Sequence, residues 1–298
     1  ARNLDPALAQ TPSELAVVGE LVEPLLKPSA DLRGVTPAAA QSYELSADGL
    51  TYTFHLRQGA AYSDGAPVRA QDFVAAWRRL LDPRVASPYA DEFAAVVSGG
   101  QTAESLDPKL DVPRLEAALA ATGLGAPDDL TFQVRLPRPE GWAQWLFALP
   151  QGAPVRAGSR AGNGPFVLRS NDAAGAVLGP NQYYPTRPGL EGIRFSVIAS
   201  DSQAVAAFNS GSLDVAPIGE ADPGLAQNLV RQPLPTVYWL DLNSSQPPFQ
   251  SAGLRQAVAA AVDRAALVRE VLHQRGSPAG SPLPAGTKAP INAPVWPS

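Results

Sequence analysis

The stretch Leu50-Thr51-Tyr52-Thr53-Phe54-His55-Leu56-Arg57 alternates between apolar and polar side chains. Alternation with a period of two predicts a β-strand with one face in a core and the other in solvent. Turn signals at Ser46-Ala47-Asp48-Gly49 and Asp64-Gly65 predict that residues 41–69 contain a hairpin. Residues 70–81 then have the spacing of an amphipathic helix. Its predicted buried stripe consists of Phe73, Val74, Trp77, Leu80 and Leu81.

Helical spacing also marks three other segments in this half of the chain. The first lies near the N-terminus, where Ser13 is the predicted N-cap and Pro28 prevents continuation. The others are residues 112–122 and 141–149. Residues 129–136 alternate again and are predicted to form a second buried strand.

The second half begins with residues 151–165, which are rich in Gly, Ala, Pro and Arg. This composition predicts a crossing between two lobes. Strands are expected at 166–170, 176–178 and 193–198, followed by a helix at 200–208 with a capping box of Ser200 and Gln203. A strand at 213–216 would complete a βαβ unit and favours a sheet with a parallel pair.

The last hundred residues predict one strand and two helices. The strand is expected at 236–242, with Trp239, Asp241 and Asn243 on its more polar face. Apolar spacing predicts a helix over 254–262, and Asp263 caps a second helix.

Composition excludes several classes of function. The net charge of −5 argues against a nucleic-acid partner, because such binding needs clustered Lys and Arg. The absence of cysteine excludes disulfides, thiol catalysis and Cys-ligated zinc. No stretch approaches the ~20 apolar residues of a membrane-spanning helix. The chain also lacks methionine at position 1, which indicates processing or excision from a longer chain.

A series of short sequence blocks occurs in one order along the chain. They are Leu4-Asp5-Pro6, Ser46 to Arg57, Tyr62 to Val68, Ala70 to Val74, Trp77 to Leu80, Ser87-Pro88-Tyr89-Ala90, Gly162 to Phe166, Gly211 to Val215, Asn243 with Pro247-Pro248-Phe249, Leu254 to Ala257 and Asp263-Arg264. Together they resemble the oligopeptide- and dipeptide-binding receptors of the bacterial extracellular solute-binding proteins, family 5. The resemblance covers essentially the whole chain, and it rests on turns, caps and core strands that identify a fold without defining a ligand.

The resemblance implies an α/β fold of the periplasmic-binding-protein type (type II, cluster C), with two lobes, mixed sheets and an incomplete second lobe. Residues 1–28 with 160–232 would form the core domain of lobe I, and residues 29–159 an extra domain inserted in it. Residues 233–298 would begin lobe II, because family members are longer. The implied function is capture of peptides or a related small solute for an ABC importer, outside the cytoplasm and without catalysis or cofactor. The implied partners are the ligand and the permease subunits, and the chain is expected to be a monomer.

Six residues are candidate ligand contacts by their positions in the matched blocks. Thr11 lies in the loop after Asp5-Pro6, and Tyr89 lies in the Ser-Pro-Tyr-Ala block. Ile218 and Gly219 follow the expected strand at 213–216, whereas Trp239 and Asp241 lie on the strand expected before Asn243. A mixed polar and aromatic surface suits a hydrated cleft that binds an extended peptide.

Two other functions stay open from sequence alone. A shortened chain of this fold could serve as a sensor or adaptor that binds a partner without carrying solute. A hydrolase would need a nucleophile paired with a base, and neither His55 nor His273 has a convincing partner in sequence. The two histidines also lack the spacing of metal ligands, so no metal site is expected.

Overall fold

The computed structural model describes residues 3–156, 161–216, 230, 236–272 and 276–280. The chain divides into two units, Ala1–Val197 and Ile198–Ser298.

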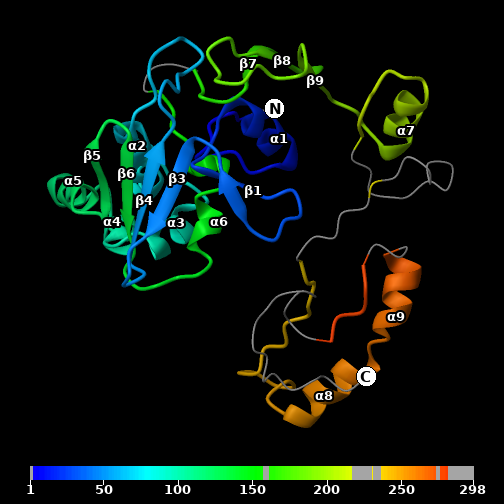
Figure 1. The fold of residues 1–298 in the computed structure, drawn as a ribbon. Helices are drawn as coiled ribbons and strands as arrows, with labels where there is room; N and C mark the ends of the chain where they lie inside the picture. Colours follow the sequence, from blue (N-terminus) through cyan, green and yellow to red (C-terminus); the bar gives the residue numbers. More distant parts are fainter. Residues whose placement is uncertain (1–2, 157–160, 217–229, 231–235, 273–275, 281–298) are drawn as a thin grey trace. The chain divides into compact units, whose positions relative to one another are not determined.

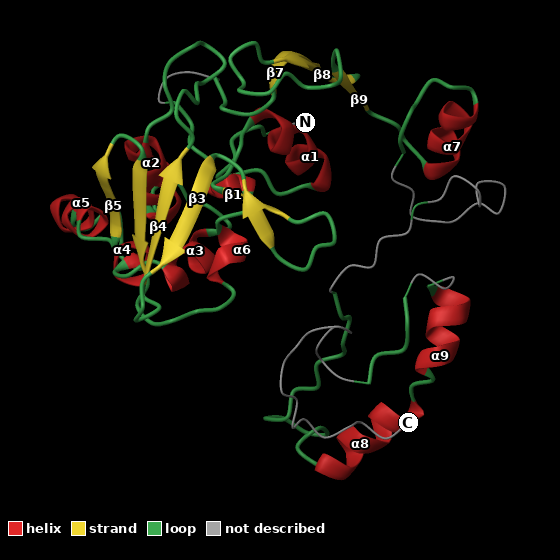
Figure 2. Ribbon diagram, viewed as in Figure 1, coloured by secondary structure: helices red, strands yellow, loops and turns green. Residues whose placement is uncertain are grey.

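A four-stranded antiparallel sheet organises the first unit (Figure 2). Its strand order is β3 (Ala40–Leu45), β4 (Thr51–Leu56), β6 (Thr131–Arg135) and β5 (Leu124–Asp128). The predicted hairpin is confirmed as the pairing of β3 with β4, in which Tyr43 lies opposite Phe54. Gly49, in the connecting turn, has φ of +71°, a conformation that glycine adopts without strain. Tyr52, Phe54 and Leu56 are buried, as the alternation predicts.

Helix α2 (Ala70–Leu81) packs against strands β5 and β6 (Figure 1). All five residues of its predicted stripe are buried. The Trp77 ring lies edge-on to Phe93, with 4.7 Å between ring centroids, and its Nε1 donates a hydrogen bond to the Gly152 carbonyl at 3.1 Å. Burial of each large apolar side chain contributes about 1.5–3 kcal/mol, so this interface accounts for much of the unit's stability.

Shorter helices complete the core around α2. They are α3 (Ala90–Val96), α4 (Gly100–Glu104), α5 (Val112–Ala120), α6 (Ala143–Leu146) and the 3₁₀ turn η1 (Pro150–Gly152). The helix predicted at 112–122 is therefore confirmed. The one predicted at 141–149 is reduced to four residues. Pro150 limits it, because the residue before a proline disfavours helical geometry.

Helix α1 (Pro12–Leu21) begins after a short loop that follows the Leu4-Asp5-Pro6 block. Its N-cap is Thr11 and not Ser13, so the predicted cap is wrong. Thr11 is the cap because Glu14 occupies the third helical position and completes a reciprocal capping box with it. A small β-ribbon follows, formed by β1 (Leu26–Pro28) and β2 (Val35–Pro37).

A three-stranded antiparallel sheet ends the first unit. Its order is β7 (Phe166–Asp172), β8 (Gly175–Pro180) and β9 (Ile193–Ser196). Phe166, Ala176 and Leu178 form a buried cluster with Val17 of helix α1. The Gly162-Asn163-Gly164 segment before β7 crosses the end of α1 so closely that a Cβ on Gly162 would lie 1.9 Å from the Leu21 carbonyl oxygen. Glycine is required there by close approach.

In the second unit, helix α7 (Asp201–Asn209) is capped by Ser200, whose side chain accepts the Gln203 N–H, which is one half of the predicted capping box. Gly211 has φ of +74° after the end of the helix. The strands predicted at 213–216 and 236–242 do not form. The expected βαβ unit is therefore wrong, and every strand pair in the described part of the chain is antiparallel. An alternating pattern predicts which side chains of a strand share a face. It does not show whether a neighbouring strand is present to form the backbone hydrogen bonds that a strand needs.

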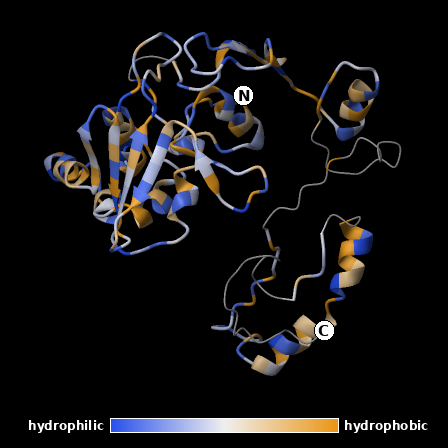
Figure 3. Ribbon diagram, viewed as in Figure 1, coloured by the Kyte–Doolittle hydropathy of each residue, from blue (hydrophilic) through white to orange (hydrophobic). Residues whose placement is uncertain are grey.

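Two further helices are confirmed in this unit. Helix α8 (Ala252–Ala261) is capped by Ser251, and α9 (Arg264–Ala266) is capped by Asp263 and continues as the π-helical turn η3 (Leu267–Val271). Neither α8 nor α9 has a buried residue, although Figure 3 shows apolar positions along both. Among the described residues of this unit, Ala204 is the one apolar residue that is buried.

Candidate functional site

The Glu14 carboxylate on helix α1 binds both ends of the loop Asn3–Thr11. Its Oε1 accepts the Asn3 N–H at 2.9 Å, and its Oε2 accepts the N–H groups of Gln10 and Thr11, each at 3.2 Å. The Glu14 residue is 8% exposed. These backbone hydrogen bonds, that of Thr11 first, lower the pKa of Glu14 to about 2. The carboxylate is therefore ionised throughout the neutral range.

Two further contacts attach this loop to the α2–α3 region. The Asp5 carboxylate accepts hydrogen bonds from both terminal nitrogens of the Arg79 guanidinium, which makes a bidentate ion pair. Arg79 Nη1 lies 2.8 Å from Asp5 Oδ1. Ser87 donates its hydroxyl hydrogen to the Ala7 carbonyl at 2.7 Å. The Leu-Asp-Pro, Trp-Arg-Arg-Leu and Ser-Pro-Tyr-Ala blocks thus meet in space and lock one loop.

Tyr89 and Thr11, two of the predicted ligand contacts, are brought close by the fold. The Tyr89 hydroxyl donates to the carbonyl of Ala9 at 2.6 Å, two residues before Thr11. Tyr89 is half-buried, whereas Thr11 is exposed and accepts the Glu14 N–H at 3.3 Å. Gln10 between them is exposed as well. The segment Ala9–Thr11 with Tyr89 is hereafter called the loop site.

The other predicted contacts belong to the second unit. Trp239 is 68% exposed, and Asp241 is also exposed. Neither lies on a strand or a helix, so the alternation that placed them on one face is not realised. Ile218 and Gly219 lie outside the described residues.

A half-buried charged cluster follows the end of helix α1. The Glu23 carboxylate pairs with Arg57 of the segment after β4 and accepts the Tyr184 hydroxyl at 2.5 Å. Burial raises the pKa of Glu23, whereas the Tyr184 hydrogen bond and the Arg57 charge act in the opposite direction. Burial, followed by the Glu23 hydrogen bond, raises the pKa of Tyr184 to about 12. The Arg57 guanidinium also lies 5.6 Å from the Tyr184 ring centroid.

Asn163 fixes the backbone of the same glutamate. Its side-chain Oδ1 accepts the Glu23 N–H at 2.8 Å, and its Nδ2 donates to the Glu23 carbonyl at 2.8 Å. The segment expected to cross between lobes is therefore joined to the end of α1 by a two-point contact. The cluster is a structural joint, because Glu23 bonds Arg57, Tyr184 and Asn163, which belong to three other segments of the first unit.

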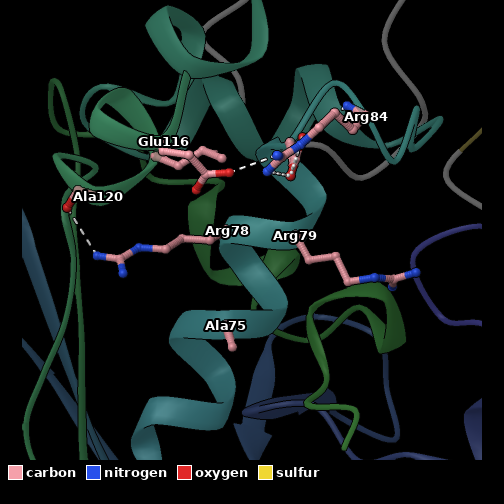
Figure 4. Close-up of a pocket in the computed structure, with 8 residues that line it drawn as sticks. Ala75, Arg78, Arg79, Arg84, Glu116 and Ala120 are labelled. Atoms are coloured by element: carbon pink, nitrogen blue, oxygen red, sulfur yellow. Dashed lines mark hydrogen bonds and ion pairs between the residues drawn. The ribbon is translucent and has the colours of Figure 1, made fainter. Parts of the chain in front are cut away.

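A surface hollow of about 290 Å³ lies between helices α2 and α5 (Figure 4). Arg78, Arg79 and Arg84 line it, and each is bonded elsewhere in the protein. Arg84 pairs with Asp82 and Glu116, Arg79 pairs with Asp5, and Arg78 donates to the Ala120 carbonyl. None of the candidate ligand contacts lines it. We assign the hollow no function.

Metal and acid–base chemistry find little support in the described residues. No group of three or more His, Cys, Asp or Glu side chains there is arranged to hold a metal ion. His55 is exposed on the polar face of β4, with its Nε2 3.7 Å from Glu44 of the neighbouring strand. His273 lies outside the described residues. None of the helices in the described ranges has both the length and the apolar character needed to cross a membrane.

Comparison with known proteins now identifies the family. Residues 34–295 match the bacterial extracellular solute-binding proteins, family 5, middle region. The chain belongs to this family. The family 5 match includes residues of both units. It also supports the receptor over the sensor or adaptor that the sequence left open.

Three family 5 relatives illustrate the similarity. The periplasmic oligopeptide-binding protein OppA of Escherichia coli is 28% identical over 99% of this chain and 57% of its own length. The structure of the Escherichia coli murein tripeptide binding protein MppA superposes with a TM-score of 0.78 at 26% identity, over 98% of this chain and 60% of that one. Haemophilus influenzae OppA in complex with RPPGFSPFR gives 0.72 at 27% identity, over 91% and 56%. The chain thus spans somewhat over half the length of these relatives.

Sequence reasoning missed the groups that shape the loop site. Glu14, Asp5, Arg79 and Ser87 were not singled out, although they hold the loop. One signal was present, because Thr11 and Glu14 have the three-residue spacing of a capping box. The Asp5–Arg79 and Ser87–Ala7 contacts join residues 74 and 80 positions apart, and no local pattern indicates such pairs.

Proposed function

We propose that this chain is part of an extracytoplasmic receptor that captures peptides and delivers them to the permease subunits of an ABC importer. The observation that carries the proposal is the family 5 match over residues 34–295. The relatives agree with it, since they include oligopeptide-binding and murein tripeptide-binding proteins. The chain would bind its solute unchanged, as a monomer and without a cofactor.

The loop site is the proposed lobe I contribution to the cleft. Recognition of peptides of varied sequence relies on hydrogen bonds to the ligand main chain, which are the same for every residue type. A loop whose backbone is held rigidly loses little conformational entropy when ligand binds. Glu14, Asp5 and Tyr89 provide that rigidity by bonding the loop from three directions.

We propose the three-part division expected from sequence as the domain organisation. Its support is the separation of buried clusters. One large cluster runs from Leu25 to Ala148, with Ala7 added. Two small clusters join helix α1 to Ala153 and to strands β7 and β8. Residues 29–159 thus have a core largely their own, and residues 1–28 pack with the segment after 160. Residues 233–298 would begin the second lobe.

Native mass spectrometry of the purified chain, followed by denaturation to release bound small molecules, tests the function. Co-purifying short peptides would support a peptide receptor. We expect titrated peptides to bind weakly, because a chain that spans about half the length of its relatives cannot enclose a ligand from both sides. Nanomolar affinity of residues 1–298 alone would contradict that expectation.

A matched pair of variants distinguishes a loss of peptide binding at the loop site from a general loss of stability. Tyr89→Phe removes the hydroxyl that positions Ala9, and we expect weaker peptide binding. Tyr183→Phe is the control, because the Tyr183 side chain is 42% exposed and lies outside the loop site. Equal peptide affinities of the two variants would argue against the loop site as part of the cleft.

A further inference from the structure

Asn163 and Gly164 form the one Asn-Gly pair in the sequence. Asparagine is chemically least stable in this dipeptide, because the backbone nitrogen of the next residue can attack the side-chain carbonyl carbon and glycine has no side chain to hinder it. Here the fold requires both members of the pair. Asn163 holds the backbone of Glu23 by two hydrogen bonds. A Cβ on Gly164 would lie 2.5 Å from the Leu21 carbonyl carbon, so a larger residue does not fit.

The folded structure opposes the attack. Asn163 is 5% exposed, and both polar atoms of its side-chain amide are bonded to Glu23. The nitrogen of Gly164, which would be the nucleophile, donates its hydrogen to the Leu21 carbonyl at 3.0 Å. The Gly164 carbonyl accepts Asn181 Nδ2 at 2.9 Å. The reaction needs rotation of the Asn163 side chain and release of the Gly164 N–H, so the closed segment is protected.

We propose that Asn163 is a latent deamidation site, which reacts when the segment 162–165 separates from the end of helix α1. The Gly164 nitrogen loses its proton to hydroxide and bonds to Asn163 Cγ, while the Cγ–Nδ2 bond breaks and ammonia leaves. Water then opens the cyclic imide at either carbonyl, which gives aspartate or isoaspartate at position 163. This modification site is independent of the proposed function.

The product is less able to close the joint at Glu23. A carboxylate at position 163 can still accept the Glu23 N–H, but it has no hydrogen to donate to the Glu23 carbonyl. Isoaspartate also adds a methylene group to the backbone where the chain passes close to Leu21. Deamidation therefore converts a transient opening of the segment into a permanent loss of one of its two bonds to Glu23.

Peptide mapping of the full 298-residue chain tests the inference. Trypsin releases residues 161–169, in which Asn163 is the one side-chain amide. The folded chain and a synthetic peptide of residues 161–169 are incubated in the same mildly alkaline buffer, and mass spectrometry follows the conversion of Asn163. We expect the folded chain to react about tenfold more slowly or less, because only its open form reacts. Equal rates in the chain and the peptide would overturn the inference.

Tyr184→Phe tests whether the joint provides the protection. The variant lacks the hydroxyl that donates to the Glu23 carboxylate, so the segment should open more often. We expect Asn163 to deamidate severalfold faster in this folded variant than in the wild type. Tyr183→Phe is the matched control, because it removes the hydroxyl of the neighbouring tyrosine, which is 42% exposed, and its rate should equal that of the wild type. If both variants react at the wild-type rate, the joint does not control deamidation and the inference fails.

Asn163→Asp places the product in the chain from the start. We expect it to unfold at a lower urea concentration than the wild type, because the Glu23 carbonyl has lost its donor. Asn243→Asp is the control for the added charge, since Asn243 is exposed and its Oδ1 accepts the Ser245 N–H, as an aspartate oxygen also can. Equal midpoints of the two variants would contradict the permanent damage to the joint. If Asn163→Asp fails to fold, the rates measured on the unaltered chain still decide whether the site is latent.

Discussion

Tyr89 donates its hydroxyl hydrogen to the carbonyl of Ala9, 80 positions earlier in the sequence, at 2.6 Å. Ala9 is fully buried, so water cannot replace this donor. The contact joins the start of helix α3 to the loop that precedes α1. Tyr89 belongs to the Ser-Pro-Tyr-Ala block, and Ala9 lies three residues after the Leu-Asp-Pro block, so the bond brings these two parts of the sequence together.

Tyr89→Phe should lower the free energy of unfolding by about 1–2 kcal/mol, because it leaves a buried carbonyl without a donor. Urea denaturation followed by circular dichroism measures the change. Tyr183→Phe is the matched control and should leave the midpoint unchanged, because it deletes a hydroxyl from a side chain that is 42% exposed. A midpoint shift of the same size in both variants would contradict the importance of the Ala9 contact.

Gly162→Ala should destabilise the first unit by about 1–3 kcal/mol or more. The added methyl group would lie 1.9 Å from the Leu21 carbonyl oxygen, which is backbone and cannot rotate away. Thermal unfolding of the purified variant measures the loss. Gly189→Ala is the control, because a Cβ there meets nothing within 4 Å. If the two variants unfold at the same temperature, α1 and the Gly162 segment do not approach as closely as described.

Acid should remove the stabilisation that Glu14 provides. Its pKa is lowered from 4.5 to about 2 in the folded protein, so the contribution is present above pH 4.5 and is lost as the pH falls toward 2. The difference in melting temperature between wild type and Glu14→Gln should therefore be larger at pH 6 than at pH 3. A difference that stays constant between these pH values would show that ionisation of Glu14 does not stabilise the loop.

Amide exchange should be much slower in helix α2 than in helix α8. Seven residues of α2 are buried, whereas none of α8 is. Exchange of a helical amide requires local opening, and tertiary packing sets the free energy of that opening. Hydrogen–deuterium exchange with peptide-level mass spectrometry compares residues 70–81 with 252–261. Comparable protection of the two helices would contradict the difference in packing.

The elements of the first unit followed largely from local patterns. The alternation at 50–57 predicted both the strand and its buried face, and the spacing at 70–81 predicted α2 and its whole stripe. These succeed because a strand or helix that covers a core must bury one face. The patterns at 213–216 and 236–242 failed because a strand also needs a hydrogen-bonded neighbour.

The sequence predicted two residues of the loop site but not the contacts that shape it. The blocks suggested Thr11 and Tyr89, but the contacts that shape the loop join residues far apart in the chain. Ser13 was preferred as the cap of α1 on residue type alone. The Glu14 carboxylate decided for Thr11, because it can return a hydrogen bond to the Thr11 N–H.

The sequence alone determined the family, the main helices and the buried face of the central hairpin, because these depend on periodicity, turns and caps within short segments. The tertiary structure decided which backbone groups of the loop site remain available. Glu14 accepts the Gln10 and Thr11 N–H groups, Tyr89 donates to the Ala9 carbonyl, and the Gln10 carbonyl accepts no hydrogen bond from the described residues. The backbone donors and acceptors of a loop that stay free are those without a partner inside the protein. Such partners include residues from distant parts of the chain, as Tyr89 shows.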